Sequence, residues 1–240
     1  MKRFIILSFL FSILLSSCHF MGGKRIRGNG KITTQNRTVN AFTSVDVRGG
    51  IDVYVKQDSV VSVRIEADEN LLEYVQVTVD RSTLDIREEK GYNLRSAKGI
   101  KVYVSGPSFN HFEASGASDI YSENKISCIN EISINATGAS SIKMELNAPK
   151  VEAELTGASH ISLKGETKTF SADGSGASGL KCFELMTEET DVELSGASNA
   201  EVFASIKLNV HVSGAADVKY KGNATLSQEA SGAGSVKKVE

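Results

Sequence analysis

Short runs of alternating apolar and polar residues fill the chain from residue 109 to residue 240, and a glycine interrupts each run. Counted from each glycine, the positions four and two residues before it and four residues after it are mostly apolar. The positions between them are mostly polar. Alternation with a period of two indicates short β-strands with one buried face, and no stripe with the 3.6-residue period of a helix competes with it.

The glycine at each interruption belongs to a recurring tetrapeptide, Ser/Thr-Gly-Ala-Ser, which becomes looser in the last two copies. Successive copies are 18 to 22 residues apart. A period near 20 residues, with short strands between turns, is typical of solenoids in which each repeat forms one coil. We therefore expect a corner of the chain at each of these seven glycines: Gly116, Gly138, Gly157, Gly176, Gly196, Gly214 and Gly232.

The chemistry of the tetrapeptide suits a tight corner. Glycine adopts backbone conformations that other residues avoid, and it allows neighbouring coils to approach closely. We expect the alanine side chain to turn inward, where little space is left, and the flanking hydroxyls to bind local backbone groups. With strands about 4.8 Å apart, seven coils would form a rod roughly 30 Å long.

Residues 31–108 carry strand signals without the tetrapeptide, as in the alternation of Val45, Val47 and Val53 around Gly49. We interpret this half as a head of irregular β coils that covers the open end of the solenoid, because an exposed coil presents unpaired backbone groups. The expected fold is all-β: a parallel β-helix-like solenoid over 109–240 with irregular N-terminal β coils.

Two segments of the head depart from the alternation. Residues 69–74 are consistent with one helical turn or a wide loop, and residues 88–99 are polar and indicate a loop. Neither segment changes the all-β prediction.

Residues 1–17 have the pattern of an export signal, with two basic residues before a short apolar core. The sequence Leu15-Ser16-Ser17-Cys18 is similar to a bacterial lipobox, in which cleavage precedes a cysteine that receives a diacylglycerol. The alternative is an ordinary signal peptide with a chance cysteine. We expect a mature protein that starts at Cys18 and is held in a membrane by its acyl chains.

Residues 18–30 hold glycines among basic residues, and we expect them to form a flexible tether. The simpler interpretation is a spacer between the anchor and the head. The alternative is a segment attracted to anionic lipid headgroups.

The composition of the chain argues against several classes of function. The chain has 240 residues and a net charge of −2, so we expect no nucleic-acid partner. The absence of tryptophan, with 2 prolines and 21 glycines, fits a repetitive β protein. No nucleophile elbow, phosphate-binding loop or dinucleotide fingerprint occurs, so we expect neither a catalytic residue nor a cofactor.

Cysteine and histidine positions offer little chemistry. Cys128 and Cys182 would lie about three coils apart, or ~13 Å, which exceeds the roughly 7 Å between the Cα atoms of a disulfide. We expect two buried thiols. His111, His160 and His211 fall at different positions of the repeat, so no imidazole cluster forms and we predict no metal site.

Charged residues recur at two positions of the repeat that should face outward. The position five residues after the glycine is mainly basic, and the position three residues before it is mainly acidic. A solvated surface is one interpretation, and a binding surface for divalent cations or an extended glycan is the other. The acidic stripe consists of Glu113, Glu154, Asp173, Glu193 and Glu229.

The opening of the head, over residues 37–39, 42–47 and 49–53, resembles the head GIN domain family of auto-transporter adhesins. Residues 102–104 and the Ser-Gly-Ala-Ser repeats are also similar to that family, and the resemblance covers about residues 30–240. It implies a right-handed β-helix-like fold in exported lipoproteins of Gram-negative bacteria. This chain has Gly-Ile-Asp where the family name has Gly-Ile-Asn.

We therefore expect a non-catalytic, lipid-anchored protein of the cell envelope, at the outer membrane, that acts as an adhesin. The adhesin label comes from the resemblance, and the expected partner is a glycan or a protein of the envelope or host surface. Two alternatives stay open. One is a carbohydrate-active enzyme, a polysaccharide lyase or hydrolase, on the same coil. The other is a structural or stress-related envelope component.

Overall fold

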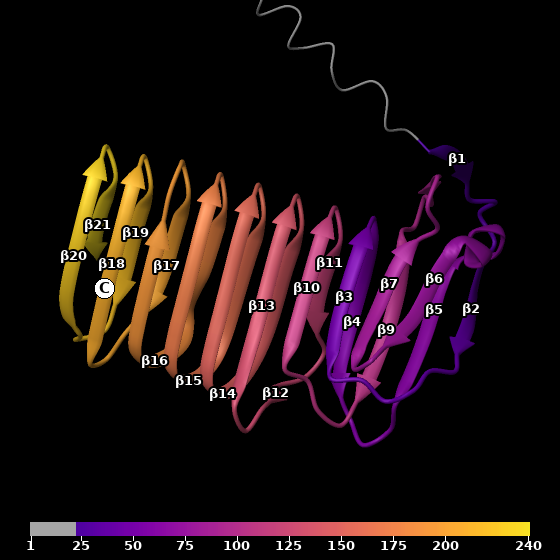
Figure 1. The fold of residues 1–240 in the computed structure, drawn as a ribbon, viewed down its shortest axis with the longest axis horizontal. Helices are drawn as coiled ribbons and strands as arrows, with labels where there is room; N and C mark the ends of the chain where they lie inside the picture. Colours follow the sequence, from indigo (N-terminus) through magenta and orange to yellow (C-terminus); the bar gives the residue numbers. More distant parts are fainter. Residues whose placement is uncertain (1–22) are drawn as a thin grey trace, which may run out of the picture.

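A computed structural model describes residues 23–240, and Figure 1 shows them as a row of stacked coils. Nineteen of the strands form one sheet system, and the remaining two pair with each other. The predicted all-β parallel solenoid is confirmed. The elements of the N-terminal half are β1 (Lys24–Arg27), β2 (Ile32–Arg37), β3 (Ser44–Gly49), β4 (Ile51–Gln57), β5 (Ser62–Asp68), the 3₁₀ helix η1 (Glu69–Tyr74), β6 (Val75–Asp80), β7 (Thr83–Glu88), β8 (Tyr92–Arg95) and β9 (Ile100–Gly106).

Each regular coil has two faces joined at its glycine. We call them the pre-glycine face and the post-glycine face; their strands run side by side in parallel with those of the next coil. The long strands β14, β15 and β16 bend and serve both faces. The elements of this half are β10 (His111–Gly116), β11 (Asp119–Ser122), β12 (Ile126–Ser127), β13 (Glu131–Gly138), β14 (Ser141–Gly157), β15 (His160–Gly176), β16 (Gly179–Leu194), β17 (Asn199–Phe203), β18 (Lys207–Gly214), β19 (Asp217–Lys221), β20 (Thr225–Gly232) and β21 (Ser235–Lys238).

The alternating apolar positions form the core between the two faces. Buried side chains from both faces belong to one continuous hydrophobic cluster that extends from the head into the regular coils. Burying a side chain of this size contributes about 1.5–3 kcal/mol, so the core grows with every coil that is added. The largest fully buried side chains are Phe109, Phe112, Phe170, Ile51, Ile65, Leu71, Leu84, Ile86, Ile120, Ile126, Ile132 and Ile134.

The seven predicted glycines stack on one another along one edge of the solenoid. All have positive φ angles, between 77° and 92°, a region that disfavours other residues. The stacking is also tight, because a Cβ atom added at Gly176 would lie 2.6 Å from the carbonyl oxygen of Gly157. Both the conformation and the close approach therefore require glycine at this corner.

The other corner residues point the opposite way from our expectation. The alanine after each of the first five glycines is exposed, and the serine that follows is buried. The serine directly precedes the post-glycine strand, and its small side chain is buried. Its hydroxyl can bond to a neighbour, as when Ser140 Oγ donates to the carbonyl oxygen of Ala114 at 3.0 Å. The buried serines are Ser118, Ser140, Ser159, Ser178 and Ser198.

The head shares the register of the regular coils. Strand β10 pairs in parallel with both β3 and β13, so the sheet runs without a break across the boundary expected at residue 108. Gly49 lies opposite Gly116 and has a φ of 113°, which makes it a further corner. Beyond it, β7 and β9 form one more parallel layer on β3 and β4.

Antiparallel strands cover the outer end of the head. Strand β6 pairs with β7, while β5 pairs with both β9 and β2, all antiparallel. The 3₁₀ helix η1 lies where a helical turn or a wide loop was expected. The change of direction ends the parallel stack and covers its backbone edge, as caps of solenoids do.

The first described segment corrects two predictions. Residues 24–27, expected within the flexible tether 18–30, form β1, which pairs in parallel with β8. Strand β8 itself lies in the stretch 88–99 that indicated a polar loop. The pairing is stabilised by Leu94, which is buried against the core although its neighbours are polar.

Candidate binding groove

The five residues of the predicted acidic stripe fall in one register column on the pre-glycine face. Glu154 pairs with Asp173, and Asp173 pairs with Glu193. The column then continues through His211 to Glu229 and, in the other direction, through Asn135 to Glu113. We call it the carboxylate column.

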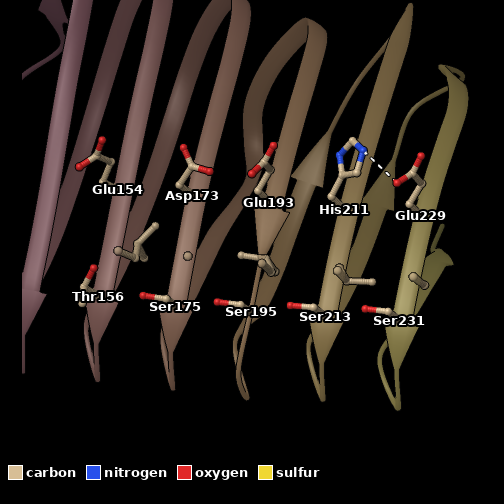
Figure 2. A pocket seen from close by; sticks show the side chains of 15 residues that line it. Glu154, Thr156, Asp173, Ser175, Glu193, Ser195, His211, Ser213, Glu229 and Ser231 are labelled. Carbon is tan, nitrogen blue, oxygen red and sulfur yellow. Dashed lines mark ion pairs between the residues drawn. The ribbon is translucent and has the colours of Figure 1, made fainter.

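A second column, of hydroxyl groups, runs beside it, two residues further along each strand (Figure 2). Between the two columns the side chains of Leu155, Leu194 and Val212 are buried, and the surface is hollowed into a groove of about 660 Å³. The groove crosses β14, β15, β16, β18 and β20. The hydroxyl column consists of Thr156, Ser175, Ser195, Ser213 and Ser231.

The carboxylates of the groove have few cationic partners. Within residues 23–240, Glu154, Asp173 and Glu193 form no ion pair with a lysine or arginine. The carboxylate of Glu229 lies 3.7 Å from His211 Nε2. Partial burial, followed by repulsion from Glu193 and Glu154, raises the pKa of Asp173. The groove therefore carries negative charge that the described residues leave available.

The N-terminal end of the carboxylate column is built differently. Glu113 lies outside the groove and pairs in register with Asp46 of β3, which in turn pairs with Asp85 of β7. Arginines replace the hydroxyls here: Arg87 lies 3.0 Å from Asp85, and Arg48 lies 3.7 Å from Asp46. Burial, then repulsion from Glu113, raises the pKa of Asp46.

Our sequence reasoning missed Asp46 and Asp85 as members of this column. The signal for Asp46 was present, because Val45, Val47 and Val53 surround Gly49 in the same pattern as in the tetrapeptide repeats. For Asp85 the layer has no glycine corner, so the repeat spacing gave no sign of it.

The post-glycine face carries the mainly basic column, extended at the head by stacked tyrosines. The ring of Tyr54 lies 5.2 Å from that of Tyr103 and 5.4 Å from that of Tyr121. Burial, with a hydrogen bond from Tyr121 to Asp119, raises the pKa of Tyr121 to about 12. A second hollow, of about 690 Å³, lies on this face. Its charges are partly paired, as Glu145 lies 3.1 Å from Lys164.

The two described cysteines are both free, as predicted, but they differ in burial. Cys182 is buried, and this burial raises the pKa of its thiol to about 12, so it behaves as a small apolar group. Cys128, expected to be buried, is only partly so, and its thiol donates to the carbonyl oxygen of Glu131 at 3.3 Å. The prediction for Cys18 falls outside the described residues. Within residues 23–240, no helix has the length and apolarity needed to cross a membrane.

Stacked coils with glycine corners, capped at one end and grooved on one face, define a parallel β-solenoid. Residues 41–224 match the family described as "Putative auto-transporter adhesin, head GIN domain", and the chain belongs to this family. No curated protein matches the chain.

Several solved structures share the fold. A putative adhesin from Bacteroides fragilis is 21% identical, with a TM-score of 0.82 over 89% of this chain and 100% of the other. A putative adhesin from Parabacteroides merdae is also 21% identical, with a TM-score of 0.71 over 90% and 100%. A putative lipid binding protein from Parabacteroides distasonis is 20% identical, with a TM-score of 0.74 over 90% and 100%.

Proposed function

We propose that this protein is a non-catalytic adhesin of the cell envelope that binds its partner in the groove on the pre-glycine face. Membership of a family described as adhesins supports binding rather than turnover. The observation that carries the proposal is a ladder of four carboxylates and one histidine, His211, beside a ladder of five hydroxyls, with no lysine or arginine among the lining residues.

The partner of this groove is an extended, positively charged segment of another protein. Successive coils repeat about every 4.8 Å, so the carboxylates are presented at regular steps that an elongated chain can follow. Unpaired carboxylates attract cations, and charge complementarity contributes both specificity and association rate.

Other ligand classes fit the groove less well. The lining residues include no aromatic side chain on which a sugar ring could stack, and their side chains are mostly charged or hydroxylated at the surface. The same polarity disfavours an acyl chain, although one solved relative in fold is described as a putative lipid binding protein. Glycosidase chemistry needs a carboxylic acid with a raised pKa in an enclosed cleft, whereas this groove is an open, regular ladder.

Binding of a fluorescent peptide that alternates lysine and serine tests the groove. The full chain should bind this peptide with an affinity that falls as salt is raised, and should not bind the matching glutamate–serine peptide. Neutralising three rungs with Glu154→Gln, Asp173→Asn and Glu193→Gln should weaken binding by about tenfold or more, because each exposed charge contributes up to about 1 kcal/mol.

The matched control neutralises three carboxylates of the hollow on the post-glycine face: Glu123→Gln, Glu184→Gln and Glu201→Gln. This variant has the same net charge as the groove variant and should bind like the wild type. Equal weakening in both variants would mean that peptide binding depends on net charge alone and not on the groove. Turnover of a polysaccharide, or binding to neutral glycans without binding to the basic peptide, would contradict the proposal.

The envelope location rests on the lipobox-like sequence that ends at Cys18. Acylation at Cys18 would hold the solenoid at the outer membrane, with β1 close to the anchor. The substitution Cys18→Ser should move the protein from the membrane fraction to the soluble fraction of the producing bacterium. Retention in the membrane fraction would rule out this anchor.

A further inference from the structure

The N-terminal end of the carboxylate column brings an imidazole and two carboxylates together. Asp46 is on β3, and His111 and Glu113 are on the adjacent parallel strand β10. The Nε2 atom of His111 lies 3.8 Å from Asp46 Oδ1 and 4.0 Å from Glu113 Oε2. One ligand atom from each of the three residues lies within 4.8 Å of the other two.

The oxygen of Asp46 that faces the imidazole has no hydrogen-bond partner among residues 23–240. Asp46 Oδ1 is buried from solvent and accepts no hydrogen bond among residues 23–240. Arg48 approaches the other oxygen, Oδ2, at 3.7 Å. Glu113 forms no ion pair with a described lysine or arginine. A buried, unpaired carboxylate oxygen is costly, and a bound cation is one of the few groups that can satisfy it.

The neighbouring coil has a carboxylate with the same burial but a different neighbour: Asp85 Oδ1 is also buried without a hydrogen-bond partner, and no imidazole lies within ion-pair distance of it among residues 23–240. Asp85 pairs in register with Asp46, and its carboxylate lies 3.0 Å from the guanidinium of Arg87. The corresponding arginine, Arg48, lies further from its carboxylate, at 3.7 Å from Asp46 Oδ2. His111, on the next coil, lies 3.8 Å from the other oxygen of Asp46. From one coil to the next, the arrangement therefore changes from an arginine–carboxylate pair to an imidazole beside two carboxylates.

We propose that Asp46, His111 and Glu113 bind a divalent transition-metal ion of the zinc class. One imidazole nitrogen and two carboxylate oxygens are a donor set that zinc accepts, and magnesium or calcium would require more oxygen ligands. In a tetrahedral zinc site the donor atoms lie roughly 3.3 Å apart. The two distances from His111 Nε2, 3.8 and 4.0 Å, exceed this value by about 0.5–0.7 Å, and the two carboxylates lie within 4.8 Å of each other. The three side chains are only partly buried, which leaves a fourth position open to water.

This site could not be recognised from the repeat pattern of the sequence. His111 is alone in its repeat position among the histidines, which argued against an imidazole cluster. The site needs only one histidine, however, and Asp46 is 65 residues away in a coil whose glycine lies outside the tetrapeptide series. Residues 50–110 separate the two strands along the chain, so their pairing could not be recognised from the sequence.

The chain contains its own comparison site. Asp191, Glu193 and His211 form a similar cluster on β16 and β18. Glu193 and His211 are exposed there, and His211 is also shared with Glu229 at 3.7 Å. This cluster has the same donor types without the buried, unpaired oxygen, so it should bind the ion more weakly.

Titration of the full chain in detergent with Zn²⁺, and with Co²⁺ as a spectroscopic substitute, tests the site. The wild type should bind one equivalent tightly and give the intense visible absorption of low-coordinate cobalt. His111→Gln should weaken this binding by at least about 100-fold, which is the upper end of the cost of losing an outer-shell partner of a metal site. His211→Gln should leave the tight binding of one metal equivalent unchanged.

Asp46→Asn provides a second variant, because it keeps the shape of the side chain and the fold while removing a charged ligand. It should also lose the tight event, while thermal unfolding shows that the variant is folded. Absence of saturable binding near one equivalent in the wild type would overturn the proposal. Full binding in His111→Gln, or loss only in His211→Gln, would overturn it as well.

Discussion

The two faces of each coil share one backbone and one register, yet neighbouring carboxylates in their two hollows have different partners. On the post-glycine face, Glu145 lies between Lys164 at 3.1 Å and Lys125 at 3.6 Å. On the pre-glycine face, Glu154 and Asp173 lie beside hydroxyl groups and each other. Charges paired within the protein add little to recognition, whereas unpaired charges in a groove are available to a partner.

Along the pre-glycine face, the carboxylate column differs between the head and the regular coils at a single position of the repeat. The residue just before the glycine is arginine in the head, at Arg48, and serine or threonine in the regular coils, as at Ser175. An arginine can form an ion pair with the carboxylate two residues earlier on the same strand, as Arg87 does with Asp85 at 3.0 Å, and a serine cannot. A stable solenoid therefore tolerates a column of unpaired carboxylates because other forces, chiefly the stacked core and corners, hold the coils together.

The largest effect is expected from a substitution at the corner that joins the two faces, because it should destabilise both. Gly176→Val should lower the free energy of unfolding by about 3 kcal/mol or more, because valine disfavours a positive φ and its Cβ would meet the backbone of Gly157. Ala177→Val is the matched control: Ala177 is exposed, so the change should stay within about 0.5 kcal/mol. Chemical denaturation measures both, and a neutral Gly176→Val or a costly Ala177→Val would contradict the corner assignment.

A smaller effect separates the two faces by their pH dependence. The pKa of Asp173 is raised by burial and by its acidic neighbours, so its charge destabilises the fold above that pKa and the cost disappears as pH falls. The pKa of Glu145 is lowered, first by its contact with Lys164, so its contribution stabilises the fold at neutral pH and is lost as pH falls through that pKa.

Melting temperatures between pH 7 and pH 3 should therefore diverge in opposite directions for two variants. Relative to Asp173→Asn, the wild type should gain stability as pH falls, and relative to Glu145→Gln it should lose stability. Both differences should shrink in high salt, since both groups are largely exposed. If both differences in melting temperature changed in the same direction with pH, the two faces would not differ in the way proposed.

The regular coils could be predicted from the sequence because each structural requirement recurs with the repeat. Seven glycines spaced 18 to 22 residues apart predicted the corners, and the alternation around them predicted the carboxylate column. The direction of the corner side chains could not be predicted, because Ala177 and Ser178 are both small. Only the path of the backbone decides that the serine points inward.

The head was harder to predict because its layers are stacked out of chain order. Residues next to one another in the stack, such as Asp46 and Glu113, are separated by the strands that form the cap. The pairing of β1 with β8 joins two short polar segments, and neither has an alternation strong enough to be recognised alone. The groove was predicted as a line of charges, while its depth depends on the apolar side chains that point away from it.

Carboxyl labelling with a carbodiimide and an amine, read by mass spectrometry, shows directly whether the groove on the pre-glycine face is the binding surface. With the lysine–serine peptide bound, Glu154, Asp173 and Glu193 should be protected, while Glu184 and Glu201 on the other face should react as in the free protein. Protection of the other face, or equal protection of both, would contradict the assignment of the groove as the binding surface.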